Sequence, residues 1–599
     1  MNGVGRESTT ERTAMQKLRR LLPLTALGAL ALLVAAGCGG GGNKSSTTST
    51  SGKAGGTVTV LESAGGVDSL DPGYWYYQTD YADLGMTTQR WLYMWKPNDT
   101  TPTPDIAAGL PQVSNGGKTL TIKLKTGIHY SAPLASRTVQ AADIKYALER
   151  CFAANVGNGY AFVYYGDIVG APSAPASSVP DISGIQAPDP STLVINTKKP
   201  VGVLANANAL ALPCTVPVPK DYASKYDQGK ASTYGQHQVF TGPYMIKGAQ
   251  TGTVPSTGYQ PSKLLVLVRN PSWTKANDFR PAYLDGITFK GGNDVTVASR
   301  QILTGRSLLS GDWAAPPASI AKSALATRKS QLLIAPSQGN RYINLNTKVK
   351  PLDNLNFRRA IAAVVNRNAL RTTRGGTYIG TVATHFIPPG MNGFDEAGGT
   401  AGPGYDFYKN PNGDVALAQS YLKKAGYPTG KYTGPPLLTI ADNQAPAKQT
   451  AEAFQQQVSQ IGIKLQFREV PHATMLSKFC EVPKAAVAIC PTLGWGKDFF
   501  DSQSMIDPVF NGRNIVPSGN TNMSQANDPK LNAQMDKAET LTDPTARAKA
   551  WGELDREITG QVYVITWLWD NQVNYASSNV KGVKNKFNSD WDLNFVSLK

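Results

Sequence analysis

Hydrophobic and polar positions follow two different periods along the chain, which predicts a mixture of strands and helices. Residues 119–125 alternate between aliphatic and polar side chains, as in a half-buried strand. Residues 141–152 instead repeat apolar side chains at helical spacing, which predicts an amphipathic helix. The stretch 153–191 is rich in Gly, Ala, Ser and Pro and predicts an irregular surface excursion. Further strands are predicted at 57–61, 263–269, 284–290 and 562–569.

The most informative pattern for topology lies in the later half of the chain. A predicted strand at 437–441 is followed by a helix at 446–461 and a second strand at 463–467. Pro446 suits the first helical position, where a missing N–H costs nothing. A strand, a helix and a strand at this spacing form a βαβ crossover, whose two strands are parallel. This part of the chain is therefore predicted to be α/β.

Length and composition indicate a large folded protein. At 599 residues the chain is long enough for several compact units. Hydrophobic residues make up 41% and charged residues 17%, and the 58 Gly and 40 Pro predict many turns. These values exclude a single small module, a disordered tail and a coiled coil.

The first 37 residues have the features of an export signal. Three basic residues at 17–20 precede an uncharged apolar stretch at 21–36, and small residues follow directly before Cys38. Met15 gives the usual short basic beginning, so we expect the start codon there. The apolar stretch is shorter than the roughly 20 residues that a membrane-spanning helix needs. We therefore expect an exported protein rather than one that spans the membrane several times.

The run Val34-Ala35-Ala36-Gly37-Cys38 resembles the lipobox of bacterial lipoproteins, in which the cysteine becomes the lipid-carrying N-terminus. It departs slightly, because Leu is commoner three places before the cysteine. The alternative is an ordinary secretory signal followed by a chance cysteine. Residues 38–56 favour the lipobox, since they are almost entirely Gly, Ser, Thr, Lys and Ala and predict a flexible tether, which needs an anchor.

The remaining four cysteines predict disulfide bonds. An even number in an exported chain suggests two of them. Cys480 and Cys490 are the obvious local pair, which leaves Cys151 with Cys214, although sequence alone allows three connectivities. The alternative, buried free thiols, is less expected outside the cytoplasm.

The net charge of +17 is strongly basic. Residues 1–37 hold five Lys or Arg and two Asp or Glu, so the processed chain keeps +14. Because the basic residues are scattered and the chain is exported, attraction to an anionic membrane or cell wall is favoured over a nucleic acid partner. The charge does not indicate the ligand.

The sequence lacks the motifs of common enzymes and metal sites. We therefore expect that the protein is not an enzyme and that it binds no cofactor and no metal ion. The isolated histidines His129, His237, His385 and His472 have no partner at the i+4 spacing of a helical metal site. Ser420-x-x-Lys423 and Lys125-Thr126-Gly127 match pieces of the penicillin-recognising serine hydrolases. Their order is reversed and no Ser-Asp-Asn lies between them, so chance similarity is favoured over a catalytic serine.

An ordered set of short motifs is similar to the extracellular solute-binding proteins of family 5, the oligopeptide- and dipeptide-type receptors of ATP-driven importers. No single motif is specific to this family, but the ordered set is. Together the motifs span nearly the whole processed chain. The motifs are Pro104 to Leu110, Leu120 to Tyr130, Ala141 to Ile144, Thr241 to Tyr244, Arg269 to Pro271, Tyr283 to Ile287, Asn346, Phe357 to Ile361, Ala425 to Tyr427, Ile461 to Ile463, and Gly494 with Trp495.

The resemblance implies a bilobal α/β fold like that of periplasmic binding proteins (type II, cluster C), with an extra subdomain in the first lobe. Lobe I would comprise 57–339, with the subdomain at about 83–200, and would be completed by 572–599. Lobe II would comprise 340–571. The chain would cross between the lobes near 341–346 and 569–574, so that two strands form a hinge and the cleft closes around a ligand.

Two segments depart from the family pattern. Many members have an Asp-Gly turn after the strand that ends near Gly127, where this chain has Ser131-Ala132-Pro133, and the excursion at 153–191 is longer than usual. Both would lie in the outer subdomain, away from the ligand. They leave the expected fold intact and the substrate class open.

The resemblance also implies where a ligand is bound. Family members that bind peptides hold the ammonium group on an aspartate three residues after a Gly-Trp pair, and Asp498 has that position after Gly494 and Trp495. The alternative is that Asp498 pairs with Lys497 or caps a turn. Trp495 would supply an apolar wall, and the backbone near Gly494 would pair with an extended peptide.

The aromatic run Tyr74-Trp75-Tyr76-Tyr77 matches the segment that faces the cleft from the first lobe. Four consecutive aromatic residues in one loop cannot all point into the core. We therefore expect Tyr76 and Tyr77 to contact the ligand, either peptide side chains or stacked sugar rings.

The expected function is that of a monomeric, lipid-anchored receptor on the outer face of the bacterial membrane. It would capture a peptide or similar small solute and deliver it to a membrane permease with its ATPase. The alternatives are a surface sensor without transport, or the same receptor role for an oligosaccharide or another non-peptide solute.

Overall fold

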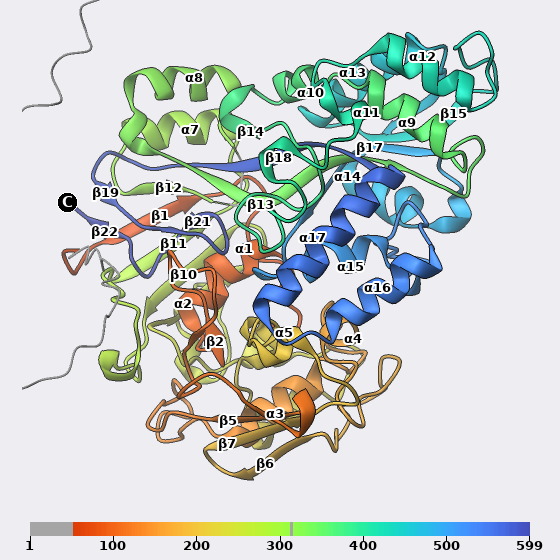
Figure 1. The fold of residues 1–599 in the computed structure, drawn as a ribbon. Helices are drawn as coiled ribbons and strands as arrows, with labels where there is room; N and C mark the ends of the chain where they lie inside the picture. The colour runs from red at the N-terminus through yellow and green to blue at the C-terminus, as the bar shows by residue number, and fades with distance from the viewer. Residues whose placement is uncertain (1–51, 312–314) are drawn as a thin grey trace, which may run out of the picture. The chain divides into compact units, whose positions relative to one another are not determined.

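The computed structural model describes residues 52–311 and 315–599 (Figure 1). The predicted signal peptide, the lipid-attachment residue Cys38 and most of the predicted tether lie outside these residues. Residues 52–56, the end of the predicted tether, have no regular secondary structure. In the two described ranges, no helix is both long enough and apolar enough to cross a membrane.

The first sheet has the strand order β12-β1-β11-β10-β8, with β9 attached to β10. Strand β1 is parallel to β11 and β12, and β10 is antiparallel to β11 and β8. The predicted strands at 57–61 and 263–269 are β1 and β10, whereas β11 begins two residues later than predicted. The strands are β1 (Thr57–Leu61), β8 (Tyr244–Ile246), β9 (Tyr259–Gln260), β10 (Leu264–Arg269), β11 (Gly286–Lys290) and β12 (Leu308–Ser310), and α7 (Val295–Thr304) and α8 (Ala318–Thr327) accompany them.

A smaller antiparallel sheet has the order β4-β5-β7-β6. Its strands are β4 (Gln112–Ser114), β5 (Thr119–Lys123), β6 (Ile185–Asp189) and β7 (Thr192–Asn196). The alternating face predicted for β5 is buried, with Leu120 opposite Ile195 and Ile122 opposite Leu193. Helix α3 (Ala141–Arg150) packs on this sheet through Ile144 and its apolar neighbours, as its periodicity predicts.

The second sheet has the order β14-β18-β13-β17-β15-β16. Its strands are β13 (Leu332–Leu345), β14 (Gly380–Thr381), β15 (Leu437–Asp442), β16 (Leu465–Val470), β17 (Ile489–Gly496) and β18 (Val564–Tyr575). The βαβ prediction is confirmed, because β15 and β16 are parallel and α13 (Ala447–Ser459) connects them. Pro446 is the N-cap of α13 rather than its first residue, so that detail of the prediction is wrong by one position.

Helices cover both faces of the second sheet (Figure 1). One face packs on a core that includes Phe357, Leu422 and Phe454. The opposite face packs on a core that also contains residues of the first and small sheets. The helices of the first group are α9 (Leu355–Val364), α10 (Arg367–Thr373), α12 (Val415–Lys424) and α13, and those of the second are α15 (Gln503–Phe510), α16 (Pro529–Glu539) and α17 (Pro544–Gln561).

Strands β13 and β18 link the two large sheets. They pair antiparallel from Leu332 opposite Tyr575 to Asn344 opposite Val564, and a bridge between Leu309 and Ala576 joins the end of β18 to β12. After β18 the chain contacts residues from its first half, where the Lys586 N–H donates to the Pro97 carbonyl (2.8 Å). The short pairs in these segments are β2 (Tyr93–Met94) with β3 (Thr103–Pro104), β19 (Val580–Lys581) with β22 (Ser597–Leu598), and β20 (Lys584–Asn585) with β21 (Asp590–Trp591).

The four cysteines that follow Cys38 form two disulfide bonds. Cys480 is bonded to Cys490, and Cys151 is bonded to Cys214. This is the pairing that the spacing favours among the three possible connectivities. The first bond holds the turn at Leu476–Cys480 against β17, and the second holds the end of α3 against the turn at Pro213–Thr215.

Candidate functional site

The predicted ligand-binding residues of the second sheet lie at the end of β17. Gly494 and Gly496 are exposed, and the indole N–H of Trp495 donates to the Ser504 carbonyl (2.8 Å), which fixes the ring against α15. Strand β17 pairs with β13 along this stretch, but its pairing with β15 is confined to Ile489 opposite Thr439. Among the described residues, the β15-side edge of β17 near Gly494 is therefore unpaired.

Asp498 follows this strand and meets a residue from the first half of the chain. Its carboxylate accepts a hydrogen bond from the hydroxyl of Tyr164, which lies at the end of α4 (Ala161–Tyr164). Burial raises the pKa of Asp498 to about 7, although the Tyr164 hydrogen bond and the Lys497 charge oppose this shift. The carboxyl group is thus held in an environment that penalises its charge.

Lys497 points away toward the C-terminal segment. Its ammonium donates to the Phe587 carbonyl and lies over the rings of Phe500 (4.8 Å) and Phe587 (5.3 Å). Burial lowers the pKa of Lys497 to about 7. The Asp498 carboxylate thus accepts a hydrogen bond from Tyr164, and the Lys497 charge acts to lower its pKa.

Four aromatic side chains, which we call the aromatic wall, adjoin Asp498: Tyr76, Tyr160, Tyr164 and Phe499. Ring centroids of successive members are 5.0, 6.1 and 4.8 Å apart. The Asp498 charge acts on all three tyrosines of the wall. Burial and this charge raise the pKa of Tyr164, so its hydroxyl stays protonated and donates. The wall gives Asp498 an apolar, polarisable surrounding.

The run from Tyr74 to Tyr77 alternates between solvent and core. Trp75 is fully buried, whereas Tyr74 and Tyr77 are 43% and 57% exposed. Tyr76 is half-buried and stacks on Tyr160, whose hydroxyl donates to the Tyr76 carbonyl (2.8 Å). Tyr76 is thus connected to Asp498 through the rings of Tyr160 and Tyr164, and Tyr77 is exposed, in edge contact with Tyr76 (5.6 Å).

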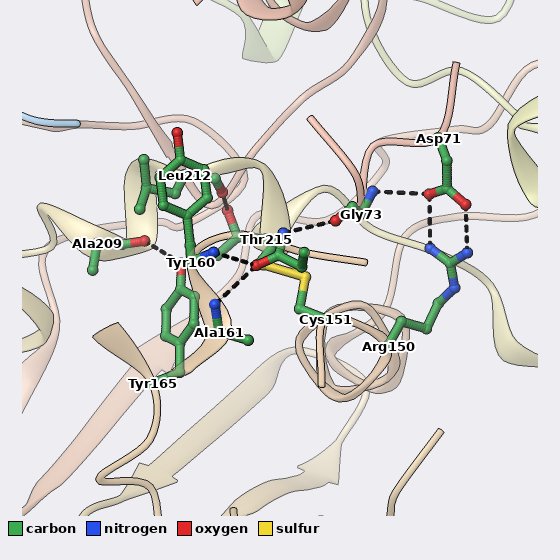
Figure 2. The surroundings of a disulfide bond; sticks show 12 residues. Asp71, Gly73, Arg150, Cys151, Tyr160, Ala161, Tyr165, Ala209, Leu212 and Thr215 are labelled. Carbon is green, nitrogen blue, oxygen red and sulfur yellow. Dashed lines mark hydrogen bonds and ion pairs between the residues drawn. A yellow bond between two sulfur atoms is a disulfide. The ribbon is translucent and has the colours of Figure 1, made fainter. Parts of the chain in front are cut away.

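The segments that carry Tyr76 and Tyr160 are fixed to α3. Figure 2 shows the Asp71 carboxylate accepting hydrogen bonds from the Gly73 N–H (2.8 Å) and from the guanidinium of Arg150 (2.8 and 3.1 Å). Cys151, which directly follows α3, forms the disulfide with Cys214 in the same view. The buried ion pair therefore anchors the start of the aromatic run to α3, and the disulfide fixes the end of α3 to residues 213–215.

The stretch 153–191 does not have the structure that we predicted. It contains α4 and β6, and Tyr160, Tyr164 and Ile168 in it are buried. It also supplies two members of the aromatic wall, so it is neither a surface excursion nor remote from Asp498. Gly, Ala, Ser and Pro dominate the composition, but the sparse aromatic residues decide the packing. The cluster Tyr160, Phe162, Tyr164 and Tyr165 is the signal that could have identified it.

The chain after Asp498 is fixed by a buried ion pair. Arg547 of α17 donates from Nε and Nη2 to the two carboxylate oxygens of Asp501, each at 2.8 Å. Gly202 lies against the same guanidinium, and the Asn206 amide donates to the Thr542 carbonyl (2.9 Å). These contacts connect the loop of Asp498 to α17 and to the segment that follows the small sheet.

Comparisons with known proteins agree with this arrangement. The model of the bacterial extracellular solute-binding proteins, family 5 (middle region), matches residues 101–516. The glutathione-binding protein GsiB of Escherichia coli O6:K15:H31 is 28% identical over 419 residues, which are 68% of this chain and 69% of that protein. GsiB of Salmonella choleraesuis is 25% identical over 476 residues, 78% of this chain and 81% of its own length.

Two solved structures have a similar fold. The clavulanic acid biosynthesis oligopeptide binding protein 2 superposes with a TM-score of 0.78 at 24% identity, over 91% of this chain and 96% of its own. The periplasmic binding protein DppA from Helicobacter pylori, in complex with the peptide STSA, gives 0.69 at 18% identity, over 91% and 98%. At these identities the likeness extends to the fold, which is a bilobal arrangement of α/β layers.

Proposed function

The chain belongs to family 5 of the bacterial extracellular solute-binding proteins, and we propose that it captures peptides or similar amine-bearing solutes outside the cytoplasm and delivers them to an ABC permease. The observation that carries this proposal is the Asp498 carboxylate, half-buried beside the aromatic wall and hydrogen-bonded by Tyr164. The ammonium group of a ligand would replace the Tyr164 hydroxyl as the donor to Asp498. In a desolvated site, a hydrogen bond from a charged donor is stronger than one from a neutral hydroxyl.

The residues assigned to the ligand are Tyr76, Tyr77, Gly494, Trp495 and Asp498. Tyr76 and Trp495 would supply apolar surface on either side of the bound solute. The names of the relatives support an amine-bearing ligand, since GsiB is a glutathione-binding protein and DppA was solved with a peptide. The fold family is one of binding proteins, and we propose no chemical reaction for this chain.

The two lobes would be 57–339 with 572–599, and 340–571, joined by β13 and β18 as a hinge. The separation of the two large sheets supports this division, as does the length of β13 and β18, which extend from the second sheet toward β12 of the first. We further propose that Cys38 carries lipid and that residues 38–56 tether the receptor to the outer face of the membrane. The lipobox-like run and the composition of the tether support this anchoring.

The unpaired edge of β17 gives a separate prediction for peptide binding. A Cβ placed on Gly496 meets no atom within 4 Å, so a valine fits the folded chain and adds a branched side chain at this end of β17. We expect Gly496→Val to leave the melting temperature within about 2 °C and to weaken peptide binding at least tenfold, because an extended peptide adds to the edge as a strand. Calorimetric titration with a tripeptide measures this. Gly109→Val, at another open position, is the matched control, and equal affinities for the two variants would exclude strand addition.

The proposed function is tested by native mass spectrometry of residues 57–599 expressed in an oxidising compartment. We expect a ladder of co-purified peptide masses, which Asp498→Asn removes. A single discrete mass of a sugar would keep the receptor role and replace the ligand class. A preparation that carries no ligand and binds no peptide on titration would contradict the proposal.

A further inference from the structure

Helices α7 and α8, with the residues that follow each of them, concentrate positive charge beside the first sheet. Residues 295–331 contain one acidic residue, Asp312, which lies outside the described ranges. They contain five basic residues: Arg300, Arg306, Lys322, Arg328 and Lys329. All five are exposed, and none forms an ion pair with a carboxylate of the described residues. We call α7, α8 and these residues the basic helix pair, because packing gathers charges that look scattered along the sequence.

The two helices lie side by side (Figure 1), and a groove of about 280 Å³ opens along them. The side chains of Arg300 and Arg328 line this groove, together with those of Ser319 and Ser323. Arg328 directly follows α8, and its guanidinium donates to the Leu303 carbonyl in the last turn of α7. Two guanidinium groups and two hydroxyl groups suit a phosphate group, which accepts several hydrogen bonds at once.

The chain enters the fold at the same end of the first sheet as the C-terminal ends of α7 and α8. Strand β1 is parallel to β12, and the Thr59 N–H donates to the Ser307 carbonyl (2.9 Å). Ser307 directly follows Arg306, and Arg328 is bonded to the last turn of α7. Residues 38–51, which precede the described chain, reach at most about 50 Å when extended. A membrane that holds the predicted lipid would therefore lie within this reach of the end of the sheet that carries the basic helix pair.

We propose that the basic helix pair binds anionic phospholipid headgroups, so that the receptor contacts the membrane through α7 and α8 as well as through its lipid. This inference rests on the anchoring part of the proposed function, which brings the membrane close. An anionic membrane surface attracts each nearby Lys or Arg by about fivefold in affinity, and a tether raises the effective concentration of the two partners. The tether favours a lipid surface over an acidic protein segment, because the chain itself limits the distance to the membrane.

The test measures how the processed chain, 38–599, sediments with vesicles when Cys38→Ser removes any lipid of its own. The vesicles are phosphatidylcholine alone, or phosphatidylcholine with about 30% phosphatidylglycerol. We expect binding to the anionic vesicles only, and its loss as the salt concentration rises from about 0.05 to 0.5 M. Arg300→Gln, Arg306→Gln and Lys329→Gln together should weaken binding at least tenfold, at about fivefold for each residue. These three side chains form no hydrogen bond or ion pair within the described ranges, so the variant should fold.

The matched control removes the same number of exposed charges from the other large sheet and its helices, through Lys423→Gln, Lys431→Gln and Lys464→Gln. It should bind the anionic vesicles as tightly as the chain with Cys38→Ser alone. Equal losses for the two triple variants would show that only the net charge matters and would overturn this inference. So would the absence of binding to anionic vesicles, including the case in which the chain binds an anionic cell-wall polymer instead.

Peptide titration keeps this inference apart from the proposed function. The triple variant of the basic helix pair should bind peptides within about twofold of the unmodified chain, because the candidate ligand residues lie outside 295–331. A chain that binds anionic vesicles but no peptide would support the membrane contact and contradict the proposed ligand class. A chain that binds peptides but no anionic vesicle would contradict the membrane contact alone.

Discussion

Asp498→Asn is expected to weaken the binding of a peptide with a free amino terminus about 100-fold, and that of its N-acetylated form less than threefold. The carboxylate is partly desolvated and adjoins the aromatic wall, so its attraction for an ammonium is screened little by water. Removing one partner of such a pair costs about 2–5 kcal/mol, and about 1.4 kcal/mol corresponds to tenfold in affinity. Isothermal titration with the two peptides measures the difference.

Asp406→Asn is the matched control for this substitution. Asp406 also accepts a tyrosine hydrogen bond, from Tyr421 (2.7 Å), but it lies in α11 (Asp406–Lys409), outside the candidate site. It should leave both affinities unchanged. Equal losses for the free and acetylated peptides in Asp498→Asn would show that Asp498 supports the site structurally and does not bind an ammonium.

The same site predicts how binding depends on pH. With a pKa of about 7, Asp498 is mostly protonated at pH 5, whereas a peptide ammonium remains charged up to pH 7. Affinity should therefore rise about 50-fold between pH 5 and pH 7. The pKa of Lys497 also lies near 7, so Lys497 loses its positive charge as the pH rises through this value. This loss removes the repulsion between Lys497 and the ligand ammonium and therefore also strengthens binding. Asp498→Asn should flatten most of this rise.

The effect on stability has the opposite sign. Because burial raises the pKa of Asp498 in the folded chain, the folded state binds its proton more tightly than the unfolded state between about pH 4 and pH 7. The ligand-free protein is therefore penalised by the ionised group at pH 8 and relieved of that penalty toward pH 5. Asp498→Asn should raise the melting temperature at pH 8, with the gain shrinking at pH 5. The ionised Asp498 carboxylate thus lowers the stability of the ligand-free protein and strengthens the binding of an ammonium.

Local patterns predicted those elements whose packing follows directly from their own sequence. Strand β5, helix α3 and the βαβ unit at β15, α13 and β16 each bury the face that their periodicity defines. The family resemblance singled out Asp498 by its Gly-Trp-x-x-Asp spacing, and the structure has this residue shortly after the end of β17. In each of these cases the information lies within about 30 residues.

The partner of Asp498 was not predictable in this way. Tyr164 is 334 positions away in the sequence, and it lies in a stretch whose small and turn-forming residues predict irregular structure. This contact is a product of tertiary packing, which a single sequence does not encode in any local period.

Asp501→Ala is expected to destabilise the folded chain by about 3–5 kcal/mol, because it leaves the guanidinium of Arg547 buried without its countercharge. Both side chains are almost fully buried, and two parallel hydrogen bonds of 2.8 Å join them. Arg547 also donates to the carbonyls of Ala538, Glu539 and Leu541, so it cannot turn toward water without breaking further bonds. Urea unfolding at pH 7, read by tryptophan fluorescence, measures the loss.

The pair also predicts a pH dependence that an exposed pair lacks. Burial alone would raise the pKa of Asp501, but the Arg547 charge and hydrogen bonds hold it below its ordinary value. Its stabilising contribution is therefore present above about pH 4 and is lost as the pH falls through the lowered pKa, so the difference between the unmodified chain and Asp501→Ala should shrink in acid.

Glu553→Ala is the matched control, since Glu553 pairs with Lys549 on the exposed face of the same helix and should have little effect. Equal, small losses for both variants would show that desolvation cancels the attraction between Asp501 and Arg547. A large loss for Asp501→Ala alone would show that the buried pair between Asp501 and Arg547 stabilises the fold, as its hydrogen bonds predict.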